Sequence, residues 1–574
     1  MRLNTVKQWF PATQWVSQYN GTHFSQDIVA AVIVTVLLIP QSLAYALLAG
    51  VPPEVGLYAS IFPLVAYALF GTSRTLSVGP VAVISLMTAT SLGGVAELGI
   101  ASYLTAAITL AFLSGVFLLI MGVLKFGFIT NFLSHSVISG FISASGIIIA
   151  LSQLKHILAI DLHGDTLREL VPSFLDNINK THFTTLLLGV SIIAFLLLSK
   201  HYANKLFCLL GVNAKLAETL GKTAPILGVF ASILVVYYLH LEDHNVAITG
   251  NVPAGLPSLA FTLPPMALIE VLAIPALLIS LIGYIESVSV GKILGSKRRE
   301  KINPNQELIA LGAANIASSL SGAFPVTGGF SRSVVNFDAG AATQAASIYA
   351  AVGIALASLF LTPILYYLPK AALAATIIVA VISLIDFSIL KETWRFAKSD
   401  FIAVLTTILL TLIYGVEVGV TSGIFASIAL HLYRTSKPHV AEVGLIEGTQ
   451  HFRNIHRYET LTVPHIITFR PDESLFFVNT NHLERLILEA VSDRKEITDV
   501  ILLCNAVNEI DFSAIGMLKE LNSQLLDQGI KLHFSEVKGP VMDALSRCDL
   551  LEKLSGNVYL TQYEAFNAIK SLSK

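Results

Sequence analysis

The sequence predicts a multi-pass α-helical membrane protein followed by a smaller α/β domain. Hydrophobic residues make up 54% of the 574 positions and charged residues only 13%, with a mean hydropathy of +0.71. A soluble protein carries about 25% charged residues, so this composition indicates the membrane class. The charged residues are unevenly distributed along the chain, because residues 441–574 hold 32 of the 74 charged side chains. We therefore expect a cytosolic or interfacial segment over residues 1–23, a membrane domain over residues 24–436 and a cytosolic domain over residues 437–574.

The remaining composition excludes several classes of partner. The net charge of −2 gives no indication of a nucleic-acid partner. The three cysteines show neither disulfide nor metal-ligand spacing, and we predict no metal and no cofactor. The N-terminus lacks an apolar signal core. Its aromatic residues (Trp9, Phe10, Trp15 and Tyr19) indicate a short helix lying at the membrane interface.

Apolar stretches long enough to cross roughly 30 Å of hydrocarbon recur along the membrane domain. Two further segments, Val78–Leu92 and Ser331–Ser347, are shorter and rich in Gly, Pro, Ser and Thr. Counting both predicts fourteen membrane segments, an even number that leaves both termini on one side. The long stretches begin near Asp27, Val55, Ala101, Ser134, His182, Ala224, Met266, Gln306, Ile348, Ala371, Phe401 and Val416.

The distribution of Lys and Arg predicts the orientation, since cytoplasmic loops carry an excess of both. Loops expected inside carry the run Lys200, Lys205, Lys215 and Lys222 and the cluster Lys297, Arg298, Arg299 and Lys301. We interpret that cluster as an orientation signal facing lipid head groups. Leu241–Pro265 has no Lys or Arg, and Gln153–Thr181 mixes charges as a small folded outer cap. Both termini are thus predicted to be cytosolic, with the chain in the inner or plasma membrane.

The two weak segments take matching places, third in each set of seven, which is typical of inverted repeats with a binding site at the midplane. In Ser73–Leu86 we expect Ser77 to cap a half-helix and Pro80 to lie in its first turn. In GGFSRSVVN (Gly328–Asn336) the glycines are expected to form the turn and the serines the cap. Two such N-termini each offer about half a positive charge and free N–H groups.

Arg332 adds a full charge to this arrangement. A guanidinium at membrane depth costs about 2.5–3.5 kcal/mol on insertion scales, so it usually faces water, a partner or a substrate. We interpret Gly328–Asn336 as one wall of an anion site that needs no metal. The alternative is a static ion pair of Arg332 with Glu286 or Asp338.

Several motifs agree in order and spacing with one known family. They are IPQSLAYALLAGVPPEVGLYASIFP (Ile39–Pro63), SVGPVAV (Ser77–Val83), LIGYIESVSVGK (Leu281–Lys292), NPNQELIALGAANIASSLSGAFPVTGGFSRS (Asn303–Ser333) and YGVEVGV (Tyr414–Val420). With these motifs the chain resembles the sulfate permease (SulP) family of anion transporters, and its tail resembles that family's STAS domain. The resemblance implies a seven-plus-seven inverted repeat of the uracil-permease type. Segments 1–4 and 8–11 would form a core domain and segments 5–7 and 12–14 a gate domain.

By motif match, the resemblance also implies the site residues. The substrate-binding residues would be Gln41, Tyr45, Gly79, Ser331 and Arg332. Polar side chains at Gln41 and Tyr45, four apart on one helix face, could instead bond a neighbouring helix.

Glu286 matches the family's coupling acid. In the sodium-coupled branch a hydroxyl residue follows that acid one turn later, whereas this chain has Val290, which favours protons over sodium. The alternative for Glu286 is a structural acid in a helix interface.

The resemblance thus predicts a secondary active, elevator-type transporter of a small oxyanion, proton-coupled and homodimeric. Sulfate, a dicarboxylate and bicarbonate are the candidate substrates. Alternatives are an anion exchanger or passive channel using the same pocket, or a membrane-bound sensor. An enzyme is not expected, because neither a nucleophile–base pair nor a metal cluster is evident.

The tail predicts a compact α/β domain with a mixed sheet. Expected strands are ITFRP, SLFFV, DVILLC (Asp499–Cys504) and IKLHFSEV, with helices near Asn481–Val491, Ser513–Leu526 and Pro540–Leu550. NEIDFSAIG (Asn508–Gly516) resembles the STAS loop of anti-sigma-factor antagonists, and Ser513 matches the serine phosphorylated there. A simple helix N-cap by Asp511 or Ser513 explains the same residues without regulation.

Overall fold

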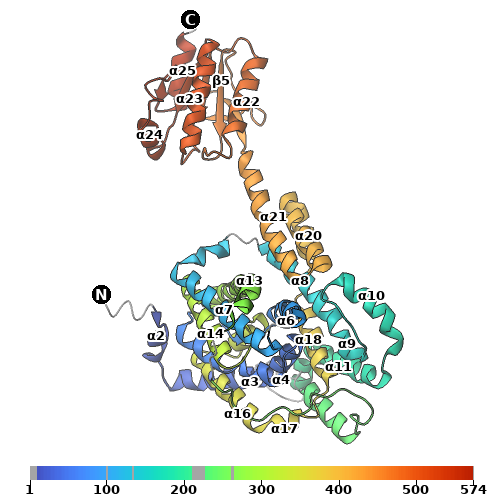
Figure 1. The fold of residues 1–574 in the computed structure, drawn as a ribbon. Coiled ribbons are helices and arrows are strands. Elements are labelled where there is room, and N and C mark those ends of the chain that lie inside the picture. Colours follow the sequence, from blue (N-terminus) through green and yellow to red (C-terminus); the bar gives the residue numbers. More distant parts are fainter. Residues whose placement is uncertain (1–8, 99–100, 132–134, 210–226, 260–263, 573–574) are drawn as a thin grey trace. The chain divides into compact units, whose positions relative to one another are not determined.

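The computed structural model describes residues 9–98, 101–131, 135–209, 227–259 and 264–572. The chain divides into two compact units, residues 1–427 and 428–574 (Figure 1). The starts expected near Ser134 and Ala224, and the orientation residues Lys215 and Lys222, lie outside the described residues.

The first unit opens with a short helix, α2 (Ala12–Val16), that packs on the helix α5 (Phe62–Phe70). The ring centroids of Phe10 and Phe70 lie 4.9 Å apart, and Trp15 Nε1 donates a hydrogen bond to the carbonyl of Ala68 at 3.4 Å. Trp9 and Phe10 still keep 45% and 44% of their surface exposed. The aromatic residues therefore pack on α5 while part of their surface stays exposed. Their placement at a membrane interface stays a prediction.

Helices form wherever an apolar stretch was expected in the described residues, and polar caps mark several starts. The Asn20 side chain accepts a hydrogen bond from His23 N, and that of Ser102 from Thr105 N. The first-half helices are α3 (Gly21–Leu48), α4 (Pro53–Tyr58), α5, α6 (Ala82–Leu98), α7 (Tyr103–Val123), η1 (Phe126–Asn131), α8 (His135–Ser152), α9 (Leu154–Leu158), α10 (Leu167–Asn177), η2 (Ile178–Lys180) and α11 (Phe183–Leu209). The expected cap Gln153–Thr181 is thus built from α9, α10 and η2.

The second half repeats this pattern. The Asn303 side chain caps α14, whose first residue is Pro304. The helices are Leu227–Tyr238, α13 (Met266–Arg298), α14 (Pro304–Leu320), α15 (Phe330–Asp338), α16 (Ala345–Phe360), α17 (Thr362–Leu365), α18 (Lys370–Ile382), α19 (Ser388–Phe396), α20 (Lys398–Tyr414) and α21 (Val416–Ser436).

Length and hydropathy alone identify fewer membrane spans than the sequence predicts. Among the described residues, six helices are long and apolar enough to cross a bilayer, or seven if a bent pair counts as one span. Other apolar helices, such as Ala345–Phe360 and Lys370–Ile382, have only 10–17 residues. Since a straight span needs about 20 residues, these shorter helices do not pass such a test. The count of fourteen stays a prediction.

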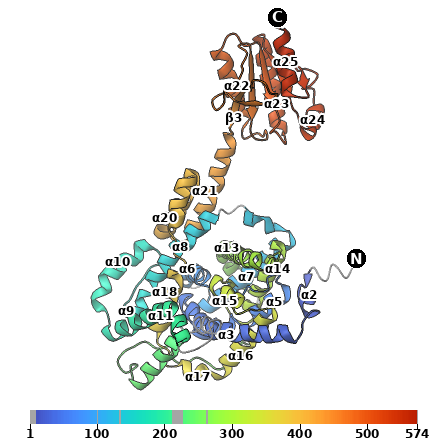
Figure 2. The same cartoon turned by 180° about the vertical axis from the view of Figure 1, so that it is seen from behind.

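The helices of the first unit pack in two groups that both combine helices from the two halves of the chain and that meet where α3 packs against α18. In one group, α7 packs against α13 and α14, and α3 packs against α15 and α16. In the other, α8 packs against α18 and α20, and α11 packs against α18. Figures 1 and 2 show early helices such as α3 and α7 lying among the later helices α13, α14 and α16.

Small residues allow the closest of these helix contacts. A Cβ atom added to Gly312 of α14 would lie 2.8 Å from Leu119 Cγ and 3.0 Å from the carbonyl oxygen of Gly115, both on α7. Close backbone approach of this kind is typical of helices packed in membranes.

The two weak segments meet in a short antiparallel ladder. Strand β1 (Val78–Gly79) pairs with β2 (Thr327–Gly328), with Val78 opposite Gly328 and Gly79 opposite Thr327. Helix α6 begins just after β1, and α15 begins just after β2. Residues some 250 positions apart in the sequence are thereby joined through their backbones.

The second unit is an α/β domain around a six-stranded mixed sheet with the order β4-β3-β5-β6-β7-β8. Strand β3 runs antiparallel to β4 and β5, while β5 to β8 are parallel. The strands are β3 (Val440–Leu445), β4 (Phe452–Asn454), β5 (Ile466–Pro471), β6 (Asp499–Leu503), β7 (Lys531–Ser535) and β8 (Val558–Tyr559); the helices are α22 (Thr480–Asp493), α23 (Phe512–Asp527), α24 (Gly539–Ser546) and α25 (Gln562–Leu572). The predicted fold class, a helical membrane protein with an α/β tail, is confirmed.

One predicted strand of the tail is wrong. SLFFV contributes only an isolated bridge between Leu475 and Ile510. Leu475 is buried, but Phe477 keeps 70% of its surface exposed, and Asn479 donates from its side chain to the carbonyl of Ser474. This local bond forms a turn that leads into α22, so the apolar run does not extend as a strand.

Candidate functional site

Arg332 lies at the centre of the candidate site and is nearly unsatisfied. It sits in the first turn of α15 with only 2% of its surface exposed. Its one hydrogen bond runs from Nη2 to the carbonyl of Thr327 at 3.2 Å, and Nε is buried without a partner among the described residues. A guanidinium offers five N–H donors, so this group has donors to spare in a place where unpaired charge is costly.

The ion pair proposed as an alternative for Arg332 does not form with Glu286. Within the described part of the chain no carboxylate oxygen of Glu286 lies within 4.0 Å of the Arg332 guanidinium. Glu286 and Tyr45 are nevertheless near enough to interact electrostatically with Arg332.

Two glycines make room for the guanidinium. A Cβ atom added to Gly79 would lie 2.8 Å from Arg332 Nη1, and one added to Gly329 would lie 2.7 Å from Arg332 Nε. The arginine of the second half therefore packs directly on the backbone of the first half. Gly79 and Arg332, which sequence reasoning assigned to one site, are in contact in the structure.

A network of small polar residues joins α15 to the segment that precedes β1. The Ser77 amide donates to Ser333 Oγ at 3.0 Å, and Ser333 Oγ donates to the carbonyl of Gly329 at 2.6 Å. The Gly329 amide donates to the carbonyl of Ser77, and Asn336 Nδ2 to that of Thr75. The start of α15 is thus held against the segment that leads into β1.

The capping predicted for these half-helices is wrong. Ser77 lies well before α6, and its hydroxyl is buried without a partner in the described structure. The N-cap of α15 is Gly329, and no side chain bonds to its first turn. Ser333 bridges to β1 instead, because the ladder brings it close to Ser77. The uncapped first-turn amides of α15 remain available to a ligand.

Helix α13 is bonded to the same ladder through residues that sequence reasoning did not assign to the site. Ser287 Oγ accepts from the Gly328 amide at 2.8 Å and lies 2.7 Å from Thr327 Oγ1. Thr327 Oγ1 donates to the carbonyl of Gly283, and Asn315 of α14 bonds both backbone groups of Val326. The only sequence signal was the density of Ser, Thr and Asn in apolar segments.

Glu286, the residue before Ser287, lines a small cavity of about 20 Å³ between α8, α13 and α21. The other lining residues are apolar: Val137, Ile138, Phe141, Ile142, Ile282, Ile285 and Val420. No hydrogen bond or ion pair of the Glu286 carboxyl group occurs among the described residues. The Glu286 side chain thus lies on the wall of an apolar cavity that also borders α8, a helix of the second group. The next residue, Ser287, bonds to the ladder.

Of the other predicted substrate-binding residues, some lie close to Arg332 and others lie at the edge of the site. Tyr45 is buried on α3, which packs against α15, and it interacts electrostatically with Arg332. Gln41, one turn earlier, is partly buried and shows no side-chain hydrogen bond to a described residue. Ser331 is exposed at the start of α15. The structure therefore groups Tyr45, Gly79 and Arg332, with Gln41 and Ser331 at the margin.

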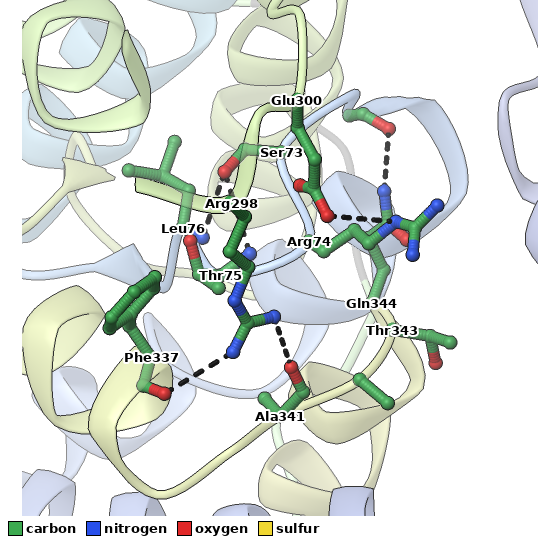
Figure 3. A network of polar contacts seen from close by, with 12 residues as sticks. Ser73, Arg74, Thr75, Leu76, Arg298, Glu300, Phe337, Ala341, Thr343 and Gln344 are labelled. Carbon is green, nitrogen blue, oxygen red and sulfur yellow. Dashed lines mark hydrogen bonds and ion pairs between the residues drawn. The ribbon is translucent and has the colours of Figure 1, made fainter. Parts of the chain in front are cut away.

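The far end of α15 is also anchored (Figure 3). Arg298, the last residue of α13, donates to the carbonyls of Phe337 and Ala341, and its guanidinium lies 4.7 Å from the Phe337 ring centroid. A cation at a helix C-terminus is favourable, because the last carbonyls lack intrahelical partners. The prediction that this basic cluster only faces lipid head groups is therefore wrong for Arg298.

A buried carboxylate holds the segment that follows α15. Asp27 of α3 accepts hydrogen bonds from the amides of Ala342 and Thr343 at 2.7 and 3.0 Å, and from Thr343 Oγ1 at 2.6 Å. Together with Arg298 it fixes the C-terminal side of the half-helix, and with it the position of Arg332.

In the second unit, Ser513 is exposed in the first turn of α23. Asp511 is the N-cap of this helix, since its Oδ1 accepts from the Ala514 amide at 2.8 Å. The capping role therefore belongs to Asp511, and a regulatory role of Ser513 stays a prediction. In the described residues, no group of three or more His, Cys, Asp or Glu side chains could hold a metal ion.

Two short strands paired in a ladder, each followed by a helix and surrounded by apolar helices long enough to span a membrane, define the architecture of the first unit. Comparison with known proteins identifies its family. Residues 24–407 match the sulfate permease family and residues 457–565 match the STAS domain. The chain belongs to the sulfate permease family, as the sequence motifs predict.

Curated relatives cover nearly the whole chain. It is 35% identical to "Sulfate transporter 4.1, chloroplastic" of Arabidopsis thaliana, covering 96% of this chain and 81% of the relative. It is 31% identical to a probable sulfate transporter of Mycobacterium tuberculosis, covering 99% of both chains. These relatives are named transporters, in agreement with the expectation that the chain is not an enzyme.

Solved structures share the fold. Murine Slc26a9, an anion transporter in the inward-facing state, aligns with a TM-score of 0.89 at 22% identity, covering 99% of this chain and 95% of that one. The transmembrane domain of the cyanobacterial bicarbonate transporter BicA aligns with a TM-score of 0.59 at 20% identity, covering 71% of this chain and 98% of that one.

Proposed function

We propose that this protein is a secondary active transporter that moves sulfate, or a closely similar small oxyanion, across the cytoplasmic membrane. One observation carries the proposal. The Arg332 guanidinium is buried, makes one hydrogen bond to a described residue, and lies at the uncapped start of α15 against the backbone of Gly79. A tetrahedral oxyanion supplies the several acceptors that this arrangement lacks.

Sulfate is the favoured substrate because the relatives at 31–35% identity are named sulfate transporters. Bicarbonate is named only for a protein that shares the fold. A dicarboxylate would also supply the negative charge that the site requires, and it is the second substrate to test.

The proposal includes proton coupling through Glu286. A carboxyl group without a partner, in a cavity that is otherwise apolar, is far cheaper to hold neutral than charged. A substrate anion beside Arg332 changes the electrostatic surroundings of Glu286, which couples proton uptake to substrate binding. Movement of one helix group past the other would carry both across the membrane, and we propose this elevator motion within a homodimer whose termini are cytosolic.

Uptake into proteoliposomes tests this function. With labelled sulfate outside and an inward proton gradient, the wild-type protein is expected to accumulate sulfate above its external concentration. Sodium gradients and the substrates succinate and bicarbonate serve as comparison arms. Glu286→Gln should still exchange sulfate across the membrane but no longer concentrate it with the proton gradient.

Arg332→Ala separates the substrate role from the proton role. Because a hydrogen bond to a charged group contributes about 1.5–3 kcal/mol, sulfate uptake should fall roughly tenfold or more. Unchanged kinetics in Arg332→Ala would remove the residue from the site. Gradient-driven accumulation by Glu286→Gln would show that another group carries the proton.

A further inference from the structure

The second unit carries a basic pocket that the transport site does not involve. It has a volume of about 450 Å³ and is lined by Arg453, Arg457 and Arg470 together with His439, Tyr458 and Asp472; Asn454 completes the wall. Every lining residue belongs to this unit. The side chains come from β4, from the turn after it, from the end of β5 and from the residues before β3.

Part of the positive charge is already neutralised. Asp472 Oδ1 lies 2.6 Å from Arg470 Nε, and Oδ2 lies 2.7 Å from His439 Nδ1. Burial alone would raise the pKa of Asp472, but the hydrogen bonds from Arg470 and His439 lower it below its ordinary value. Asp472 is therefore ionised at neutral pH and pairs with Arg470.

Two guanidinium groups remain without a counter-charge. Arg453 donates from Nη1 to the neighbouring carbonyl of Phe452 at 3.2 Å and has no ion pair in the described structure. Arg457 has neither a hydrogen bond from its guanidinium nor an ion pair with any described residue. Two unpaired positive charges that line one pocket favour a doubly charged anion.

The pocket wall is preorganised by the backbone. Strand β4 pairs with β3, placing Arg453 opposite Gly444. After the strand, Asn454 Oδ1 accepts from the His456 amide at 2.8 Å, and the Asn454 carbonyl accepts from the amides of Arg457 and Tyr458 at 3.1 Å. The strand pairing thus positions Arg453, and this tight turn positions Arg457.

We propose that this pocket binds a phosphate group carrying two negative charges. Planar guanidinium forks match phosphate oxygens in bidentate fashion, and the Tyr458 hydroxyl and Asn454 amide add neutral donors. Such a group occurs in soluble phosphates and in the head group of an anionic phospholipid. Only Lys437 and Pro438 separate His439 from the end of α21, an apolar helix long enough to span a membrane, so a lipid source is included in the test.

Calorimetric titration of the purified full-length protein in neutral detergent tests the proposal. The probes are inorganic phosphate and dihexanoyl phosphatidic acid, with dihexanoyl phosphatidylcholine as the lipid without net charge. The variant Arg453→Gln/Arg457→Gln should bind the preferred probe about tenfold more weakly or worse. The control Arg485→Gln/Lys495→Gln removes the same charge from residues that do not line the pocket and should bind like the wild type.

The outcomes separate the two sources. Binding of inorganic phosphate, with or without similar affinity for phosphatidic acid, indicates recognition of the phosphate group itself, whereas binding of phosphatidic acid only indicates a lipid head group. Any binding at the transport site is common to wild type and variant, so their difference reports the pocket. Equal affinities in the wild type and the Arg453/Arg457 variant, or no binding of either anionic probe, would overturn the proposal. Unchanged thermal unfolding of the variant confirms that it is folded.

Discussion

At the scale of single residues, the site depends on how few side chains and hydrogen-bond acceptors surround Arg332. A buried guanidinium usually has carboxylate or carbonyl partners on several sides. Here glycines replace side chains on two sides, and one carbonyl accepts a single hydrogen bond. Because Gly79 and Gly329 have no Cβ atoms, the guanidinium can pack against both of them. Its other N–H donors have no hydrogen-bond partner among the described residues.

Gly79→Ala tests this packing. The new Cβ would lie 2.8 Å from Arg332 Nη1 and must displace the guanidinium, since overpacking of this kind costs about 1–3 kcal/mol. We expect sulfate uptake to fall roughly tenfold in proteoliposomes, with little change in the amount of folded protein. Gly93→Ala in the same segment is the matched control, because a Cβ there meets no atom within 4 Å. Equal uptake by the two variants would contradict the packing role of Gly79.

At the scale of elements, the sequence predicts segments better than it predicts their pairing. Apolar length and Gly/Pro interruption located the two weak segments, because both are local properties of the chain. The β1–β2 ladder was not predicted, since two-residue strands leave no periodic pattern. Ser77 resembles a cap locally, but its amide bonds to Ser333 from the other half. Partners so distant in sequence are decided by tertiary packing.

In the tail too, the sequence predicts elements from local patterns but does not predict contacts between distant residues. Strands β5, β6 and β7 and their helices were predicted because they alternate regularly. SLFFV has strand-like composition, yet the turn stabilised by Asn479 takes precedence. Arg298 looked like part of a charge cluster, and only the structure places it at the end of α15.

Arg298→Gln tests whether anchoring the far end of α15 positions the anion site. Loss of two charge-assisted hydrogen bonds should destabilise the half-helix by about 1–3 kcal/mol, with a discount for partial exposure. We expect a higher KM for sulfate and a lower thermal midpoint. Lys301→Gln, which removes a charge from the same loop, should leave both unchanged. A normal KM in Arg298→Gln would show that α15 holds its position without this contact.

At the scale of the whole molecule, the first unit consists of two helix groups that touch where α3 packs against α18 and α6 packs against α8. Helix α6 packs on α3, α7 and α13 of the first group, and Gly423 of α21 packs on Thr407 of α20 in the second group. Ser91 of α6 donates to Glu417 Oε1 of α21 at 2.8 Å, joining one group to the other. Ser114 of α7 and Ser280 of α13 are 2.9 Å apart within a single group. An elevator motion requires the first contact to break and the second to persist.

Cysteine pairs at these positions test the motion in a background with Cys208, Cys504 and Cys548 replaced by serine. Crosslinking Ser91→Cys to Glu417→Cys should stop sulfate uptake, and reduction should restore it. Crosslinking Ser114→Cys to Ser280→Cys should leave uptake nearly unchanged, because both residues would move together. Full uptake with the first pair crosslinked would contradict relative movement of the groups.

The most direct test of the account is the position of a bound oxyanion. Selenate can replace sulfate, and its selenium can be located by anomalous scattering in crystals of the protein. We predict a peak beside the Arg332 guanidinium, between the starts of α6 and α15, with the amides of the first turn of α15 directed at its oxygens. A selenate peak elsewhere, with Arg332 still bonded only to Thr327, would contradict the proposed site.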